Sequence, residues 1–254
     1  MGPYSVFTAA TILATVAVTC NTALVAQTSK EWSQCSGGEG PIVDVIISGC
    51  SAVIHGGHDS PKRLATAFNN RGVVYKFKGE YDRALDDYNQ AILLNPSYAN
   101  AYNNRGVIYR LKGDYDRAIK DYDEAIWLDS SIPAFFYNRA IAYTEKQDYD
   151  RAIADFEMVL RFNSKNALAL YGRGVVRLKK GDSQTGSADI ADAKAINPNV
   201  AEEFEHSARR QVLRIILMRR NAAFIPDQNS PCKRAVKIET GPRSALWAKS
   251  AINW

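Results

Sequence analysis

The chain has 254 residues, of which 46% are hydrophobic and 23% charged, a composition typical of an ordinary soluble protein once the apolar N-terminus is set aside. The net charge of +5 is uneven: residues 1–200 hold 22 basic and 22 acidic side chains, whereas residues 201–254 hold 10 and 5. Nucleic-acid-binding domains carry a basic excess on the folded body. The neutral body therefore argues against nucleic acid as a partner.

Residues 1–26 are predicted to be an export signal. From Val6 to Ala26 no side chain is charged, and the run ends in the sequence ALVAQ, which places a signal-peptidase cleavage after Ala26. The same run is just long enough to span a membrane, so an uncleaved anchor over residues 6–26 is the alternative. We therefore expect an exported chain, either periplasmic or secreted, or one anchored by residues 6–26.

One block of sequence recurs at a fixed period from Ala65 to Val200. Its clearest stretch, NNRGVIYRLKGDYDRAIKDYDEAI at positions 103–126, is preceded by NNRGVVYKFKGEYDRALDDYNQAI at positions 69–92 and followed by YNRAIAYTEKQDYDRAIADFEMVL at positions 137–160. Each copy repeats a small residue, then an alanine or glycine, then an aromatic or apolar residue, at Gly72, Gly106, Ala140 and Gly174, at Ala84, Ala118, Ala152 and Gly186, and at Tyr88, Tyr122, Phe156 and Ile190. The copies at positions 69, 103 and 137 are 34 residues apart. A fixed period of this length indicates a solenoid of stacked helical hairpins.

The pattern resembles the tetratricopeptide repeat family. The resemblance implies an all-α, right-handed superhelical solenoid with repeats at residues 65–98, 99–132, 133–166 and 167–200. A capping helix is expected at residues 201–220, where an apolar stripe faces a row of arginines. Residues 221–254 lose the periodicity and are predicted to form a flexible basic tail.

Residues 27–64 are expected to form a degenerate leading hairpin, because moving Ala84 back by one period gives Cys50. In an oxidising compartment, Cys35 and Cys50 are expected to form a disulfide. In the chain-entropy model, such a loop stabilises the fold by about 3 kcal/mol. Two buried free thiols are the alternative.

The residues offer no constellation for catalysis. His55 and His58, with Asp59 nearby, lie in a Gly-rich loop that is interpreted as a connector and not as a metal site, because no third or fourth ligand follows at helical spacing. No triad, carboxylate pair or phosphate-binding loop is present in the sequence. We therefore expect a protein that is not an enzyme and has no cofactor, no metal and no small-molecule substrate.

An arginine precedes the small residue of each first helix, and an aspartate precedes the aromatic or apolar residue of each second helix. These two rows are Arg71, Arg105, Arg139 and Arg173, and Asp87, Asp121, Asp155 and Asp189. Antiparallel packing brings the rows together, so they are predicted to form structural ion pairs within a hairpin or between neighbours. Losing one partner of a buried pair is costly. Ligand binding by the arginines is the alternative.

In the tetratricopeptide family the first helices line a concave groove that contacts extended peptides. The resemblance assigns this role to Asn69, Asn70, Lys76, Asn103, Asn104, Arg110, Tyr137, Asn138 and Tyr171. The asparagine row is similar to the ladder of O-linked N-acetylglucosamine transferases, and a carboxamide offers both a donor and an acceptor to a peptide backbone. Solvation or a hydrogen bond between adjacent hairpins is the alternative for these asparagines. Lys76 and Arg110 favour an acidic partner, although Val73 and Ala134 depart from the carboxylate-clamp type of groove.

The leading hypothesis is an exported, non-enzymatic scaffold or adaptor that holds a peptide or helix of a partner protein in its groove. The alternative is an envelope-associated structural or assembly factor that acts through the basic capping helix and tail. In that case residues 201–220 make weak contact with an anionic membrane surface or an acidic partner.

Overall fold

The computed structural model describes residues 29–36, 43–57, 59–205 and 207, and these residues are helical with no strand among them. The predicted all-α solenoid is confirmed. The expected export signal at residues 1–26 and the tail at 221–254 lie outside the described residues, as does most of the expected capping helix. Within the described part of the chain, no helix is both long and apolar enough to cross a membrane.

The solenoid is built from consecutive antiparallel hairpins. Residues 29–35 form a short helix, and α2 spans Val43–Gly56. The repeats then supply α3 (Pro61–Lys78) with α4 (Tyr81–Leu94), α5 (Ala99–Leu111) with α6 (Tyr115–Leu128), α7 (Pro133–Glu145) with α8 (Tyr149–Phe162), and α9 (Ala167–Lys180) with α10 (Ser183–Ile196). Helix α3 thus begins before Ala65, the expected start of the first repeat.

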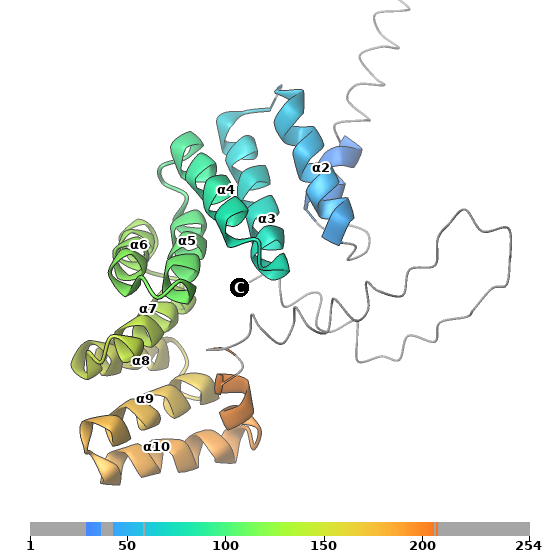
Figure 1. Cartoon of the computed structure of the whole chain (residues 1–254). Coiled ribbons are helices and arrows are strands. Elements are labelled where there is room, and N and C mark those ends of the chain that lie inside the picture. Colours follow the sequence, from blue (N-terminus) through green and yellow to red (C-terminus); the bar gives the residue numbers. More distant parts are fainter. Residues whose placement is uncertain (1–28, 37–42, 58, 206, 208–254) are drawn as a thin grey trace, which may run out of the picture.

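The second helices α4, α6 and α8 each pack against both their own first helix and the first helix of the next hairpin, and α10 packs against α9. The first helices α3, α5, α7 and α9 also contact one another in succession. The stack therefore curves into an arc with α5 and α9 on its inner side and α6 and α10 on its outer side (Figure 1). We call the surface of α3, α5, α7 and α9 that faces the inside of this arc the inner face.

The tight turn inside each hairpin follows from the sequence. Within two residues after each first helix, one residue has a left-handed backbone, with φ of 77° at Gly79, 79° at Gly113, 64° at Gln147 and 98° at Gly181. Glycine adopts this conformation without strain. The second helices α6, α8 and α10 are each preceded by an aspartate, Asp114, Asp148 or Asp182, whose carboxylate accepts a hydrogen bond from a backbone N–H of the first helical turn.

The recurring small and aromatic residues form the core of each hairpin. A Cβ atom added at Gly106 would lie 2.8 Å from Cε1 of Tyr122, and one added at Gly72 would lie as close to Tyr88. Both tyrosines are fully buried, as is Phe156 in the third repeat. The small residue is therefore required because the ring of the second helix lies directly against the backbone of the first.

The leading hairpin carries the Cys35–Cys50 disulfide, so the predicted pairing is present. Both cysteines are buried, and they pack with Trp32, Val53 and Ala67. The disulfide ties the short helix at residues 29–35 to α2, at the N-terminal end of the described solenoid.

Candidate functional site

The two charged rows meet in every repeat. Each arginine donates from Nε and Nη2 to both carboxylate oxygens of the aspartate in its own hairpin, at 2.7–2.9 Å. The third guanidinium nitrogen, Nη1, reaches the preceding second helix, at Ser51 from Arg71, Asn89 from Arg105 and Asp123 from Arg139. Each of these three arginines therefore joins its own hairpin to the one before it.

The electrostatics of these pairs agree with a structural role. The hydrogen bond to its aspartate is the main cause that raises the pKa of Arg71, Arg105 and Arg173. Burial raises the pKa of Asp121 and Asp155, and the arginine hydrogen bonds oppose this rise. Because every aspartate of the row is at most 6% exposed, the hydrogen bonds that the arginines donate to them lie inside the solenoid.

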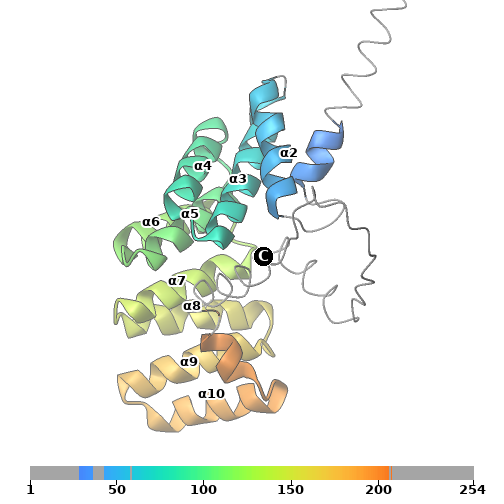
Figure 2. The same ribbon diagram turned by 45° about the vertical axis from the view of Figure 1, so that its right-hand side comes forward.

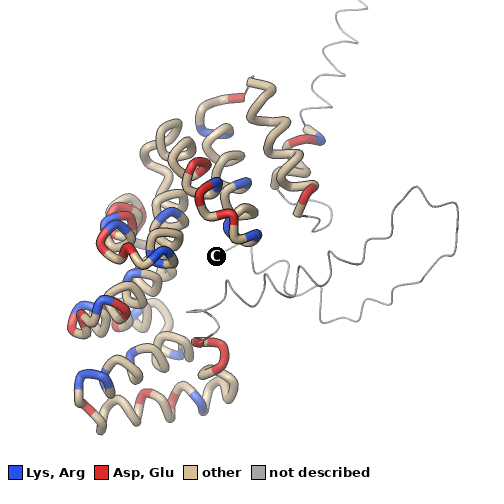
Figure 3. Tube along the Cα trace, viewed as in Figure 1, with Lys and Arg blue, Asp and Glu red and all other residues tan. Residues whose placement is uncertain are grey.

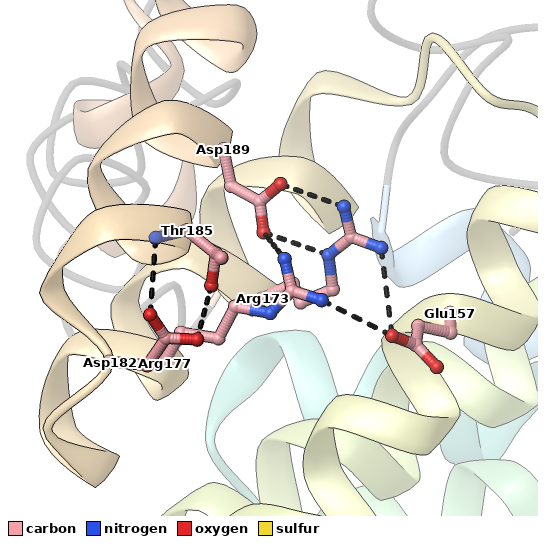
Figure 4. A network of polar contacts seen from close by, with 6 residues as sticks. All are labelled: Glu157, Arg173, Arg177, Asp182, Thr185 and Asp189. Atoms are coloured by element: carbon pink, nitrogen blue, oxygen red, sulfur yellow. Dashed lines mark hydrogen bonds and ion pairs between the residues drawn. The ribbon is translucent and has the colours of Figure 1, made fainter.

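The last repeat contains a larger network than the sequence analysis anticipated. Figure 4 shows Arg173 and Arg177 converging on Asp189 and both reaching Glu157. Arg177 stands where the earlier repeats carry an aromatic residue. The signal for its role was present in the sequence, since Arg177 lies one turn after Arg173 and faces the same aspartate.

A second periodic set of ion pairs was also missed. Lys112 Nζ lies 2.7 Å from Asp82 Oδ1, and Lys146 and Lys180 pair in the same way with Asp116 and Asp150. Each pair joins the end of one first helix to the start of the preceding second helix. These ion pairs were not predicted, although each lysine lies at the same separation along the chain from its aspartate.

The asparagines of the expected groove bond to one another across the hairpin boundaries. Asn104 Nδ2 donates to Asn69 Oδ1 at 2.9 Å, and Asn138 Nδ2 donates to Asn103 Oδ1 at 2.8 Å. Asn70 Nδ2 donates to the carbonyl of Cys35 at 3.4 Å. Since Asn69, Asn103 and Asn104 are at most 8% exposed, this geometry favours the alternative of hydrogen bonds between adjacent hairpins.

The tyrosines expected in the groove are covered by the chain itself. After α10, a short helical stretch at residues 200–205 folds back towards α9 (Figure 2). There the hydroxyl groups of Tyr137 and Ser207 lie 3.0 Å apart, and the rings of Tyr171 and Phe204 have centroids 5.3 Å apart. The inner face of α7 and α9 is thus occupied in part by the residues that follow the fourth repeat.

Gly172 explains this arrangement. It breaks the asparagine row, and a Cβ atom there would lie 2.6 Å from Cζ of Phe156 and 2.9 Å from Cε2 of Phe204. A larger side chain would therefore displace Phe204 from its position against Phe156 and Tyr137. The absence of an asparagine at this position is what lets the chain close over its own last repeats.

The inner face of α3 and α5 carries two cations with different surroundings. Arg110 Nη1 donates to Glu145 Oε1 at 2.8 Å, and the arginine side chain is only 9% exposed. Lys76 is half-buried, and the contact found for it is with the ring of Phe77, 5.3 Å from Nζ to the centroid. Burial, and to a smaller degree the charge of Arg110, lowers the pKa of Lys76 to about 8.

Elsewhere on the described helices, basic and acidic residues are interspersed and neither sign gathers on one side (Figure 3). No cluster of three or more His, Cys, Asp or Glu side chains placed to hold a metal ion occurs in the described ranges. His55 donates from Nδ1 to the carbonyl of Ser51 in its own helix at 2.6 Å, whereas His58 lies outside the described residues.

Comparison with known proteins identifies the repeat. Residues 65–98 and 99–131 match the family model described as Tetratricopeptide repeat, and residues 141–181 match the model described as TPR repeat. The chain is a tetratricopeptide repeat protein. Members of this family are generally non-enzymatic scaffolds for protein interactions.

Solved structures of other tetratricopeptide repeat proteins share this fold. A MamA protein is 18% identical, with a TM-score of 0.56, over 70% of this chain and 96% of its own. YrrB, described as a TPR protein with an unusual peptide-binding site, is 17% identical, with a TM-score of 0.53, over 70% of this chain and 84% of its own. MamA from Desulfovibrio magneticus RS-1 is 13% identical, with a TM-score of 0.55, over 62% and 86%. At these identities the likeness is one of fold.

Proposed function

We propose that this chain is a non-enzymatic interaction module that binds an extended segment of a partner protein on the inner face of α3 and α5. The observation that carries the proposal is the contrast along this face. Residues 204 and 207 of the chain cover α7 and α9, whereas Lys76 on α3 lies half-buried with no carboxylate partner among the described residues. A charge left in this way favours a ligand that supplies its counterpart.

The fold is compatible with this use, because the similar protein YrrB has a peptide-binding site. In our chain the binding surface is proposed to consist of the half-buried side chains Val73, Lys76, Val107 and Arg110. The asparagines play a supporting part in this proposal, since their carboxamides hold the hairpins in register. We place the partner segment along α3 and α5, with Tyr137 and Tyr171 beyond its end.

Site-specific crosslinking tests this proposal in the full chain. A photo-crosslinking amino acid would replace Val73 or Val107 on the inner face, and Trp127 on α6, which is 77% exposed, is the matched outer control. We expect covalent adducts with one partner protein from the two inner positions and none from Trp127. Adducts from Trp127 alone, or from all three positions equally, would contradict the proposal.

We also propose that the protein works after export, in an oxidising compartment, and the Cys35–Cys50 disulfide supports this location. Thiol alkylation in denaturant after acid quenching of intact cells, followed by mass spectrometry, tests it. We expect Cys35 and Cys50 to resist alkylation in denaturant until a reductant is added. Full alkylation without reductant would place the protein in a reducing compartment.

The alternative function through the basic capping helix rests on arginines outside the described residues.

A further inference from the structure

We propose that Lys76 and Arg110 together form the docking site for a carboxylate of the bound segment, so that the partner carries an acidic residue or a chain terminus at this point. The inference rests on the proposed function and names the chemistry that the inner face selects. The register of the repeats, the burial of Lys76 and the charges nearby support it.

The first helices contact one another through a constant register. Asn69 meets Asn104, Asn103 meets Asn138, and Arg110 meets Glu145, each pair at the same separation along the chain. The same register pairs Lys76 with position 111, which is a leucine packed against the apolar core. The cation of the second repeat therefore has an internal carboxylate, and the equivalent cation of the first repeat has none among the described residues.

Within the described structure, Lys76 lacks an internal carboxylate in surroundings that disfavour its charge. Burial is the main reason that its pKa falls to about 8, and Arg110 on α5 is the charged group that lowers it further. Two cations near each other in a partly buried position are unfavourable. A carboxylate placed between them would form a charge-assisted hydrogen bond with Lys76 and be attracted by the charge of Arg110.

The same charges argue for a single carboxylate over a more highly charged anion. Glu145 already balances Arg110, so Lys76, when protonated, is the cation of this pair without a counter-charge among the described residues. Lys179 is exposed and acts on Glu145 from the fourth repeat. A phosphate group with two negative charges would be repelled by Glu145 more strongly than a single carboxylate.

A synthetic random peptide library supplies the probe. Peptides of random sequence with both ends blocked would be retained on the full chain and sequenced by mass spectrometry, and a second library would keep a free C-terminal carboxylate. We expect Asp and Glu to be enriched in the blocked library, or the free-ended peptides to be retained preferentially. Lys76→Gln should reduce this preference about tenfold. The control Lys194→Gln, at an exposed lysine of α10, should leave it unchanged.

The outcomes separate this inference from the proposed function. Peptides retained on the wild-type chain without any preference for a carboxylate would overturn the docking site and leave the proposed function standing. An undiminished preference in Lys76→Gln would also overturn it. If neither library were retained at all, the proposed function itself would fail. Preference for the free-ended peptides alone would identify the carboxylate as a chain terminus.

A second pair of variants tests the register argument. Leu111→Glu supplies Lys76 with an internal carboxylate, as Glu145 does for Arg110, so it should abolish the preference for acidic peptides. Leu111→Gln introduces a side chain of the same size without charge and should keep the preference. Circular dichroism would confirm that both remain helical, and equal preference in the two variants would contradict the proposal.

The pH dependence adds an independent readout. Wild-type binding should weaken as the pH rises through about 8, because Lys76 then loses its proton. Lys76→Arg should bind acidic peptides without this decline, since arginine stays charged. A wild-type chain whose affinity is constant across this range would show that Lys76 does not contact the ligand.

Discussion

The first two repeats and the last two present different surfaces although they share one pattern. On α3 and α5 the inner face carries two cations, Arg110 and Lys76, and Lys76 has no carboxylate partner among the described residues. On α7 and α9 it is covered by Phe204 and Ser207. The comparison shows that a repeat fixes the backbone and the core, whereas single substitutions in the repeat decide which part of the surface is left for a ligand.

The largest expected effect concerns the ion pairs. Arg105→Ala leaves Asp121 buried and unpaired, which should lower the free energy of unfolding by about 3–5 kcal/mol. Arg173→Ala should cost clearly less, because Arg177 Nη1 still donates to Asp189 at 2.8 Å. Urea unfolding of both variants measures the difference.

The double variant Arg173→Ala with Arg177→Ala is the control for that comparison. It removes both donors from Asp189 and should bring the loss in the last repeat up to that of Arg105→Ala. Equal losses for Arg105→Ala and Arg173→Ala would mean that the network of the last repeat gives no protection, and that the second and fourth repeats do not differ in this respect.

An intermediate effect is expected where the chain covers itself. Phe204→Ala removes a half-buried ring from contact with Tyr171 and Phe156, which should lower the free energy of unfolding by about 1–3 kcal/mol. Hydrogen exchange of residues 200–207 should rise, while exchange in α3 and α5 stays the same. Gly172→Asn restores the asparagine row and should displace Phe204 in the same way. Unchanged exchange in both variants would show that Phe204 does not hold this stretch in place.

The smallest effect concerns a difference inside the core. The hydroxyl of Tyr88 is buried without a hydrogen-bond partner in the described structure, and the third repeat has Phe156 at the same position. Tyr88→Phe should therefore leave the stability unchanged or raise it by about 1 kcal/mol, because an unsatisfied polar group is removed. Thermal unfolding measures this, and a clear loss of stability would reveal a partner for the hydroxyl.

The sequence predicts the structural features that recur in every repeat. The fixed period of the four copies predicts the hairpins, and the constant separation of Arg71 and Asp87 predicts a contact between the two helices. What it did not predict depends on the distance between neighbouring first helices. At that distance the carboxamide of Asn104 reaches Asn69 and bonds to it and not to a ligand. No residue pattern within one repeat predicts the distance. The contact of Phe204 with the last repeats was not predicted either. The need for a glycine at position 172 depends on the ring of Phe204, which lies beyond the end of the fourth repeat.

Gly172 also has a consequence for how such an array can lengthen. Solenoids gain repeats by duplication of internal segments. A copy of the fourth repeat placed in the middle of the array would bring Gly172 opposite a regular first helix in place of Phe204, where it offers no carboxamide to the preceding hairpin and lacks the ring that fills the space beside it. Copies of the second repeat would carry their own asparagines and ion pairs and would fit at any boundary. New repeats in relatives of this chain should therefore have descended from the first half of the array, with the fourth repeat kept at its end.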